Sequence, residues 1–206
     1  MSLVLYYAPQ TRALNILWAL EELAVPYEKV KLDFSQKEQK SDAFRRINPN
    51  GRVPAMVVDG TPMWESLAIL TYLGDRYGAA KELWPALDAP ERIEALTWST
   101  WGIVTLGANA LRIGMSSGSF VPKERHNPAE AAAARTDVEG DLAILDERLA
   151  TRSFVLGDGF TLADIALGGP VALTARLGLD LAPYAKVKSW WGRVSERPAR
   201  QKAVQQ

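Results

Sequence analysis

The segment that most constrains the fold is AMVVDGTPMW at residues 55–64, in which two short apolar runs are joined by Asp59 and Gly60. A two-residue Asp-Gly connection between such runs strongly favours a tight antiparallel β-hairpin. Pro54 stands directly before the first run. Because proline has no N–H to donate to a neighbouring strand, it fits an edge strand, the first residue of a strand or a turn. The segment therefore predicts a hairpin that the chain enters through Pro54.

The chain before this hairpin has the pattern of a strand, a helix and a second strand. Residues 3–7 predict a buried strand, apolar residues recur with a helical period from Thr11 onward, and residues 27–32 alternate as in a half-buried strand. Two strands joined through a helix are expected to be parallel, with a right-handed crossover. A short helical stretch around Phe44 precedes the hairpin, and a helix that ends near Gly78 follows it. The first module is therefore βαβ-ββα.

The second half of the chain is different. Residues 79–90 contain two prolines and no clear period, which is typical of a linker. Beyond it we find no strand-like run, and helices are predicted over 91–113, 128–152, 162–176 and 183–196. The fold class is thus α/β plus all-α, with an α/β domain at 1–78, a linker at 79–90 and an all-helical domain at 91–206.

Two of these helices have clear start signals. Asn127, Pro128 and Glu130 offer an N-cap, the favoured N1 proline and a capping-box acid. Thr161 and Asp164 offer a second capping box. The first predicts where a helix starts, and the second predicts a structural role rather than a binding site.

Composition narrows the possible functions. The 206 residues include 24 basic and 24 acidic side chains, so the formal net charge is zero, and no basic run offers the patch that nucleic-acid or membrane-surface binding needs. The chain has no cysteine and one histidine, His126, which excludes disulfides, thiolate metal sites, a cysteine nucleophile and a His-based metal cluster. The reactive group must therefore come from a small-molecule partner. The start lacks a basic n-region, and no apolar stretch is long enough to span a membrane, so we expect a cytoplasmic protein.

Several motifs together resemble the cytosolic glutathione S-transferase superfamily, in particular a bacterial, theta/beta-like member without cysteine. They are YYAPQTRALNILWALEEL, NPNGRVP, WES, GDGFTLADI and RVSERPARQKA, and they extend over nearly the whole chain. The resemblance implies an N-terminal thioredoxin-like, glutathione-binding domain followed by an all-helical C-terminal domain. It also implies glutathione as a substrate and a homodimer.

The same resemblance implies the residues that bind glutathione. A cis bond between Val53 and Pro54 would turn the Val53 backbone N–H and C=O outward, where an extended tripeptide could pair with them as a short added strand. Ser66, as N-cap of the following helix, would bind the γ-glutamyl carboxylate at the positive helix end, and Glu65 would bind the ammonium. Arg52 is a weaker candidate for the glycyl end or the cysteinyl region. The alternatives are a trans proline, a simple N-cap and a solvated arginine.

The group that activates the thiol is less clear, since this sequence departs from the family pattern. Ala8 falls where several members carry a serine, and Arg12 falls near the position of the cysteine in others. The remaining donors are Thr11, one of the tyrosines Tyr6 and Tyr7, and the amides that begin the first helix. We predict Thr11 first, although it could be a pure N-cap, and Tyr7 second.

The resemblance predicts transfer of the glutathione thiolate to a hydrophobic electrophile, a detoxification reaction, with hydroperoxide reduction or isomerisation as related activities. The absence of cysteine argues against members that exchange thiols through a mixed disulfide. An alternative is a non-catalytic binding or interaction module on the same scaffold. The predicted co-substrate pocket is lined by residues of the long helix that begins the second domain: Trp98, Trp101, Gly102, Thr105 and Arg112. The alternative for Trp98, Trp101 and Thr105 is a core or a subunit interface, of which their helical spacing is more often typical.

Overall fold

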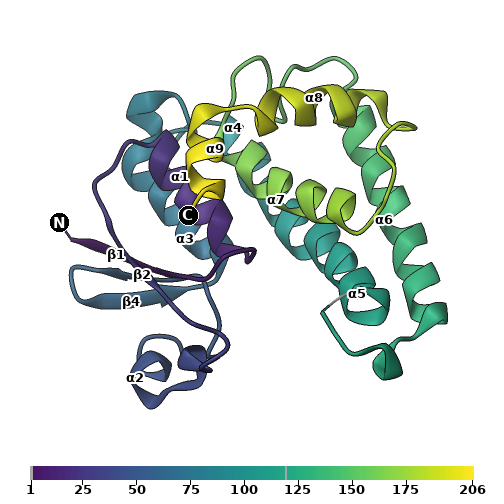
Figure 1. Ribbon diagram of the computed structural model, residues 1–206. Helices are drawn as coiled ribbons and strands as arrows, with labels where there is room; N and C mark the ends of the chain where they lie inside the picture. Colours follow the sequence, from purple (N-terminus) through teal and green to yellow (C-terminus); the bar gives the residue numbers. More distant parts are fainter. Residues whose placement is uncertain (1, 119) are drawn as a thin grey trace. The chain divides into compact units, whose positions relative to one another are not determined.

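The computed structural model describes residues 2–118 and 120–206 (Figure 1). Contacts divide the chain into two compact units. The first unit comprises the chain up to Asp88 together with Arg197–Gln206, and the second comprises Ala89–Glu196. Within the described residues, no helix is both long enough and apolar enough to cross a membrane.

The first unit contains a mixed four-stranded sheet in the order β2-β1-β3-β4, formed by β1 (Leu3–Tyr7), β2 (Glu28–Lys31), β3 (Ala55–Val58) and β4 (Thr61–Trp64). The pairing of β1 with β2 is parallel, as the strand-helix-strand pattern predicts, and the other two pairings are antiparallel. Asp59 and Gly60 form the predicted hairpin turn with φ values of 46° and 83°. Positive φ at both central residues is what this turn requires.

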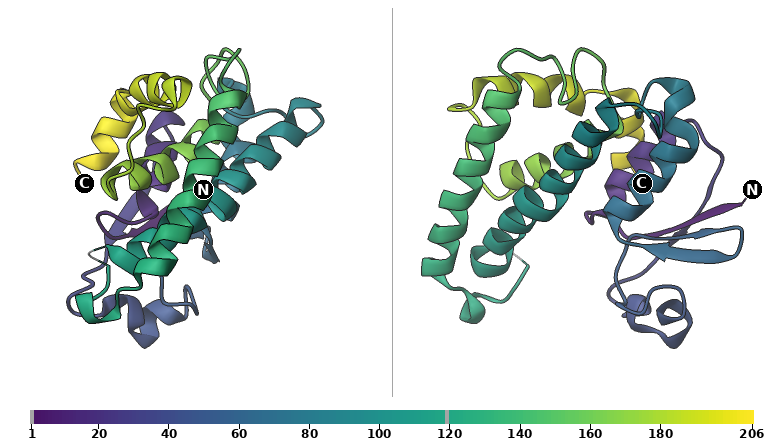
Figure 2. Two further views of the ribbon diagram at one scale, coloured as in Figure 1. Left: turned by 90° about the vertical axis from the view of Figure 1, so that its right-hand side faces the viewer. Right: turned by 180° about the vertical axis from the view of Figure 1, so that it is seen from behind.

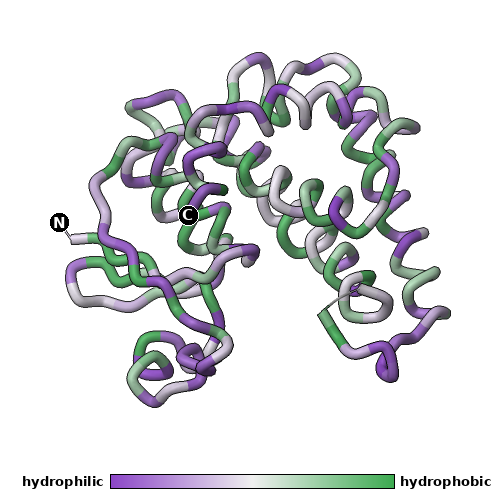
Figure 3. Tube along the Cα trace, viewed as in Figure 1, coloured by the Kyte–Doolittle hydropathy of each residue, from purple (hydrophilic) through white to green (hydrophobic). Residues whose placement is uncertain are grey.

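The half-buried character predicted for the second strand is wrong. All four residues of β2 are exposed, and Val30 retains 38% of its accessible surface. The reason is position in the sheet: β2 is an edge strand that pairs only with β1. Only Leu32, directly after the strand, is buried, and it joins a cluster with Phe44 and Ala55. Figure 3 shows the contrast between the hydrophobic β1 and the mostly hydrophilic segment that follows β2.

Helices complete the first unit: α1 (Ala13–Glu22), α2 (Asp42–Arg45), α3 (Ser66–Leu73) continued by the π-helical turn η2 (Gly74–Gly78), the short 3-10 turns η1 (Glu38–Lys40) and η3 (Ala79–Lys81), and α9 (Pro198–Val204). Helix α1 is buried over most of its circumference, from Ala13 to Leu20. Burial alternates along β1, and its residues Leu3, Leu5 and Tyr7 are part of the core.

The terminal helix α9 lies beside α1, although the sequence analysis assigns it to the all-helical domain (Figures 1 and 2). Two ion pairs of 2.6 Å hold it there, from Arg197 to Glu22 and from Lys202 to Glu21. The Arg200 guanidinium also lies 5.9 Å from the centre of the Trp18 ring. Long-range charge pairs, which sequence periodicity does not report, place this segment.

The second unit is helical, as predicted: α4 (Glu91–Thr100), the π-helical η4 (Trp101–Leu106), α5 (Gly107–Ser117), the short η5 (Lys123–Arg125), α6 (Pro128–Arg148), α7 (Leu162–Arg176) and α8 (Ala185–Ser195). The predicted capping box at Thr161 is confirmed, and the Thr161 N–H donates to Asp164 Oδ2 at 2.8 Å. Buried Asp164 also accepts from Trp190 Nε1 at 2.8 Å, so this cap ties α7 to α8. Asn127 caps α6 as predicted.

Glu130, predicted as the capping-box acid of α6, has a different partner. Its carboxylate accepts from Arg112 Nε at 2.7 Å. The backbone N–H from which a capping-box acid would accept, that of Asn127, donates instead to the carbonyl oxygen of Ser116 at 2.8 Å. The Glu130 side chain therefore pairs with Arg112 on α5 and does not cap α6, so the predicted capping role is wrong.

Candidate functional site

The loop that enters β3 leaves one residue with unused backbone groups. The peptide bond between Val53 and Pro54 is cis, as predicted. Pairing of β3 with β1 ends at Ala55 opposite Tyr6. Within residues 2–118 and 120–206, neither the N–H nor the C=O of Val53 has a hydrogen-bond partner. Two such groups on one residue are able to pair with an extended peptide that adds as a short strand.

The loop before Val53 is tightly fixed. Gly51 has φ of 58°, and a Cβ at this position would lie 2.6 Å from the carbonyl oxygen of Gln39, so only glycine fits. Lys40 Nζ donates to the carbonyl oxygen of Asn50 at 3.3 Å, which places a cation next to the loop. Sequence reasoning missed Lys40 because it lies in a hydrophilic segment without a recognisable motif.

Glu65 and Ser66 lie at the start of α3, one position away from the predicted roles. Glu65 is the N-cap, with φ of 70° and ψ of 121°, and Ser66 is the first helical residue. No side chain caps this helix, and the Ser66 hydroxyl, in a residue that is only 5% exposed, has no hydrogen-bond partner among the described residues. The N-terminal end of α3 therefore offers an uncapped helix end and a hydroxyl group, and both suit a carboxylate.

Three charged side chains gather around this helix start. Desolvation lowers the pKa of Arg12, the nearby carboxylate of Glu65 opposes that shift, and the charge of Arg52 adds to it. Arg12, Arg52 and Glu65 thus interact electrostatically, and together they carry one net positive charge. The structure brings the predicted residues Arg52, Val53, Pro54, Glu65 and Ser66 into one unit, with Arg12 in addition.

Of the two residues predicted to activate a thiol, Thr11 has hydrogen-bond partners within the protein and Tyr7 is buried. The Thr11 hydroxyl donates to the carbonyl oxygen of Ala8 at 2.7 Å and accepts from the Ala13 N–H at 3.3 Å. Because a hydroxyl has a single proton, Thr11 would have to release Ala8 in order to donate to another atom. Tyr7 is 5% exposed in the core, whereas the ring of Tyr6 packs on Phe44 at a centroid distance of 5.6 Å.

The residues predicted to line a co-substrate pocket lie in the second unit. The rings of Trp98 and Trp101 meet edge to face at 5.4 Å, and the Arg148 guanidinium lies 5.1 Å from the centre of the Trp98 ring. Arg112 donates to Glu130, Asp137 and Asn109, so its charge is already paired. Gly102 packs on Leu167 with no room for a Cβ, and Thr105 is half-buried. Assignment of this set to a pocket stays a prediction.

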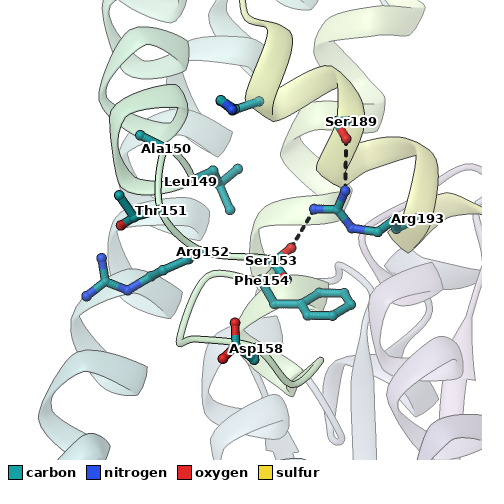
Figure 4. Close-up of a pocket in the computed structure, with 10 residues that line it drawn as sticks. Leu149, Ala150, Thr151, Arg152, Ser153, Phe154, Asp158, Ser189 and Arg193 are labelled. Carbon is teal, nitrogen blue, oxygen red and sulfur yellow. Dashed lines mark hydrogen bonds between the residues drawn. The ribbon is translucent and has the colours of Figure 1, made fainter.

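A cavity of about 490 Å³ in the second unit lies between α8 and the loop that follows α6, and it contains none of the predicted site residues (Figure 4). Arg193 reaches from α8 to this loop. Its guanidinium donates to Ser189 Oγ at 2.8 Å and to the carbonyl oxygen of Ser153 at 2.6 Å, and it lies 5.7 Å from the centre of the Phe154 ring. These contacts give Arg193 a structural role, which is to hold the loop against α8. Among the described residues, no three His, Asp or Glu side chains form a group that could hold a metal ion.

Comparison with known proteins finds two matching families, the glutathione S-transferase N-terminal domain over residues 1–75 and the C-terminal domain over residues 108–198. Glutathione S-transferase GstB of Escherichia coli is 34% identical over 197 residues, which cover 94% of this chain and 93% of GstB. The disulfide-bond oxidoreductase YfcG of E. coli is 30% identical, with coverage of 97% and 93%. Among solved structures, a glutathione transferase homologue from Lodderomyces elongisporus with two glutathione molecules per subunit matches with a TM-score of 0.91 and 27% identity, covering 100% of this chain and 98% of its own.

The backbone of Glu65 yields a prediction about stability. A non-glycine residue at φ 70° and ψ 121° carries conformational strain of about 1–3 kcal/mol. Glu65→Gly and Glu65→Ala both remove the carboxylate, but only glycine removes the Cβ that causes the strain. We expect Glu65→Gly to be more stable than Glu65→Ala by about 1 kcal/mol, the reverse of the usual order. Urea unfolding monitored by tryptophan fluorescence measures the difference, and an alanine variant of equal or greater stability would contradict it.

Proposed function

This chain belongs to the glutathione S-transferase family and is a glutathione transferase, and from that premise we propose that it binds glutathione as a thiolate and conjugates it to a hydrophobic electrophile. One observation carries the proposal: the unpaired backbone of Val53 and the uncapped start of α3 belong to the same unit. An extended peptide with a free amino acid group at one end satisfies both.

The proposed binding mode follows from the chemistry of each group. The central, cysteinyl residue of the tripeptide pairs its N–H and C=O with the C=O and N–H of Val53. The γ-glutamyl carboxylate accepts from the Ser66 hydroxyl and the first amides of α3, and the adjacent ammonium pairs with Glu65. The glycyl carboxylate lies toward Arg52 and Lys40.

The local charge supports thiolate formation. A free thiol has a pKa near 8.5, so most glutathione is protonated at neutral pH. The net positive charge of Arg12, Arg52 and Glu65 favours the anion and lowers the pKa of a bound thiol. In conjugation the thiolate sulfur forms a bond to the electrophilic carbon, and either a leaving group departs with its electron pair or the adduct takes up a proton.

A second candidate function is glutathione-dependent reduction of disulfides, which the similarity to the disulfide-bond oxidoreductase YfcG favours, with hydroperoxide reduction as a related reaction. Without a protein cysteine, one bound glutathione thiolate attacks the substrate disulfide, forming a mixed disulfide and releasing a substrate thiolate. A second glutathione then attacks the mixed disulfide, so that the products are oxidised glutathione and two substrate thiols. With a hydroperoxide, the thiolate attacks the terminal oxygen, which gives the sulfenic acid of glutathione and releases the alcohol. A second glutathione then reacts with the sulfenic acid, and the products are oxidised glutathione and water.

Calorimetric titration with reduced glutathione tests the binding site. We expect micromolar to low millimolar affinity in the wild type and a loss of about tenfold or more in Ser66→Ala, because a hydrogen bond to a charged group contributes about 1.5–3 kcal/mol. Ser35→Ala, in an exposed loop of the same unit, is the matched control and should bind as the wild type does. Equal affinity of Ser66→Ala and the wild type would contradict this site.

A substrate panel then separates the two reactions. Turnover of an aromatic halide without formation of oxidised glutathione indicates conjugation, whereas oxidised glutathione formed from a disulfide or a hydroperoxide indicates reduction. Glutathione binding without turnover of any of these substrates would leave a non-catalytic module and refute the proposed chemistry.

For the activating group we propose Thr11 first and Tyr7 second, as the hydroxyl donors nearest the start of α1. The double variant Thr11→Ala with Tyr7→Phe should lose most conjugating activity, since general acid–base groups contribute about 10²–10⁴-fold to rate. Thr11→Ser with Tyr7→Phe keeps the hydroxyl at position 11 and is the control. Initial rates at several pH values measure both. If the Thr11→Ala, Tyr7→Phe variant is as active as the wild type, neither hydroxyl is the activating group. The remaining candidates are then the charge of Arg12 and the first amides of α1.

We also propose a homodimer. Large apolar side chains are exposed along the segment from α4 to α5, with Ile93 at 74%, Val104 at 58% and Met115 at 48%. Exposed apolar surface of this kind is typical of a subunit interface. Light scattering should give twice the chain mass of 22.7 kDa. Val104→Glu should shift the mass toward the monomer, and a wild type that is monomeric at micromolar concentration would refute the dimer.

A further inference from the structure

The side chain of Asn48 has an unusual position for a polar group in a loop. It is only 2% exposed, and every hydrogen bond of its amide group stays within residues 48–52. Its Nδ2 donates to the carbonyl oxygen of Arg52 at 2.6 Å. Its Oδ1 accepts from the backbone N–H of Asn50 at 3.0 Å and from Asn50 Nδ2 at 3.1 Å. A buried amide with this many bonds is a rigid anchor.

The bond to Arg52 matters because of the peptide unit to which that carbonyl belongs. The Arg52 C=O and the Val53 N–H lie in one planar peptide group, and in a trans peptide they point in opposite directions. The cis bond of this loop is the next one, between Val53 and Pro54. Asn48 therefore fixes the carbonyl on the protein side and, by the same plane, directs the Val53 N–H away from the loop interior.

The loop has other restraints that do not involve this side chain. The backbone N–H of Asn48 donates to Phe44 O at 2.9 Å, and the Gly51 N–H donates to Asn48 O at 2.9 Å. Gly51 also packs closely on Gln39. These main-chain bonds hold the turn, so the particular contribution of the Asn48 amide is the orientation of the peptide between Arg52 and Val53.

We propose that Asn48 is a positioning residue for the glutathione site: it aims the Val53 N–H at the cysteinyl carbonyl of the bound tripeptide. The inference rests on the proposed function. A hydrogen bond accepted by the Arg52 carbonyl also polarises its peptide group, which makes the Val53 N–H a stronger donor. Asn48 itself touches no substrate.

Two ligands separate this role from a general structural one. Glutathione has the cysteinyl carbonyl, whereas γ-glutamylcysteamine keeps the γ-glutamyl group, the amide N–H and the thiol but lacks that carbonyl. We expect Asn48→Ala to weaken glutathione binding by about tenfold in calorimetry, the factor expected for one hydrogen bond of roughly 1.4 kcal/mol. Binding of γ-glutamylcysteamine should stay unchanged. Asn50→Ala removes another partner of the same amide and is the matched control, with no change for either ligand.

The outcomes are distinct. An equal loss for both ligands, or no loss for either, with normal wild-type binding, overturns the positioning role alone. A wild type that binds neither ligand overturns the proposed glutathione site and this inference with it. Should Asn48→Ala fail to fold, Asn48→Ser replaces it, because serine also lacks the Nδ2 group that donates to Arg52 and adds no charge.

Discussion

Hydrogen bonding of the backbone between α2 and β3 is the constraint on which the candidate site depends. The pairing of β3 with β1 stops at Ala55, and the turn before it satisfies its own groups through Asn48 and Gly51. Between these two regions Val53 has a donor and an acceptor with no partner in the described chain. An extended ligand is able to pair with both groups without any change in the sheet. The scaffold thus provides a binding edge through the register of its strands.

Electrostatics distinguishes this region from the rest of a chain with no net charge. Several arginines elsewhere have close carboxylate partners: Arg148 pairs with Glu94, Arg197 with Glu22, and Arg112 with Glu130. Around Glu65, one carboxylate interacts with Arg12, whose pKa Arg52 also influences. An excess of positive charge at an uncapped helix start favours an anionic ligand, and the strained φ of Glu65 is the conformational cost of placing its carboxylate there.

Features that depend on a few adjacent residues were predictable from the sequence. The Asp59-Gly60 turn, the cap at Thr161 and the parallel pairing of β1 with β2 are confirmed, because local conformational preference or chain connectivity determines them. Features that depend on distant partners were not. The exposure of β2 follows from its edge position, and α9 packs on α1 through the ion pair of Arg197 with Glu22. The residues of the candidate site could be named from the sequence. That Glu65 rather than Ser66 is the N-cap of α3 could not, because it depends on the backbone angles of Glu65.

The contrast between local features and features with distant partners also explains why the glutathione-binding groups are easier to assign in this chain than the group that activates the thiol. The proposed recognition of glutathione uses backbone groups and a helix end, which the fold holds whatever the side chains are. Activation of the thiol needs one proton donor at one atom, and the Thr11 proton already serves the Ala8 carbonyl. Whichever group activates it, a bound thiolate is not restricted by its own chemistry to one second substrate. Electrophilic carbon, disulfide sulfur and peroxide oxygen can all react with it, so the choice among these reactions depends on which second substrate the protein admits to the sulfur.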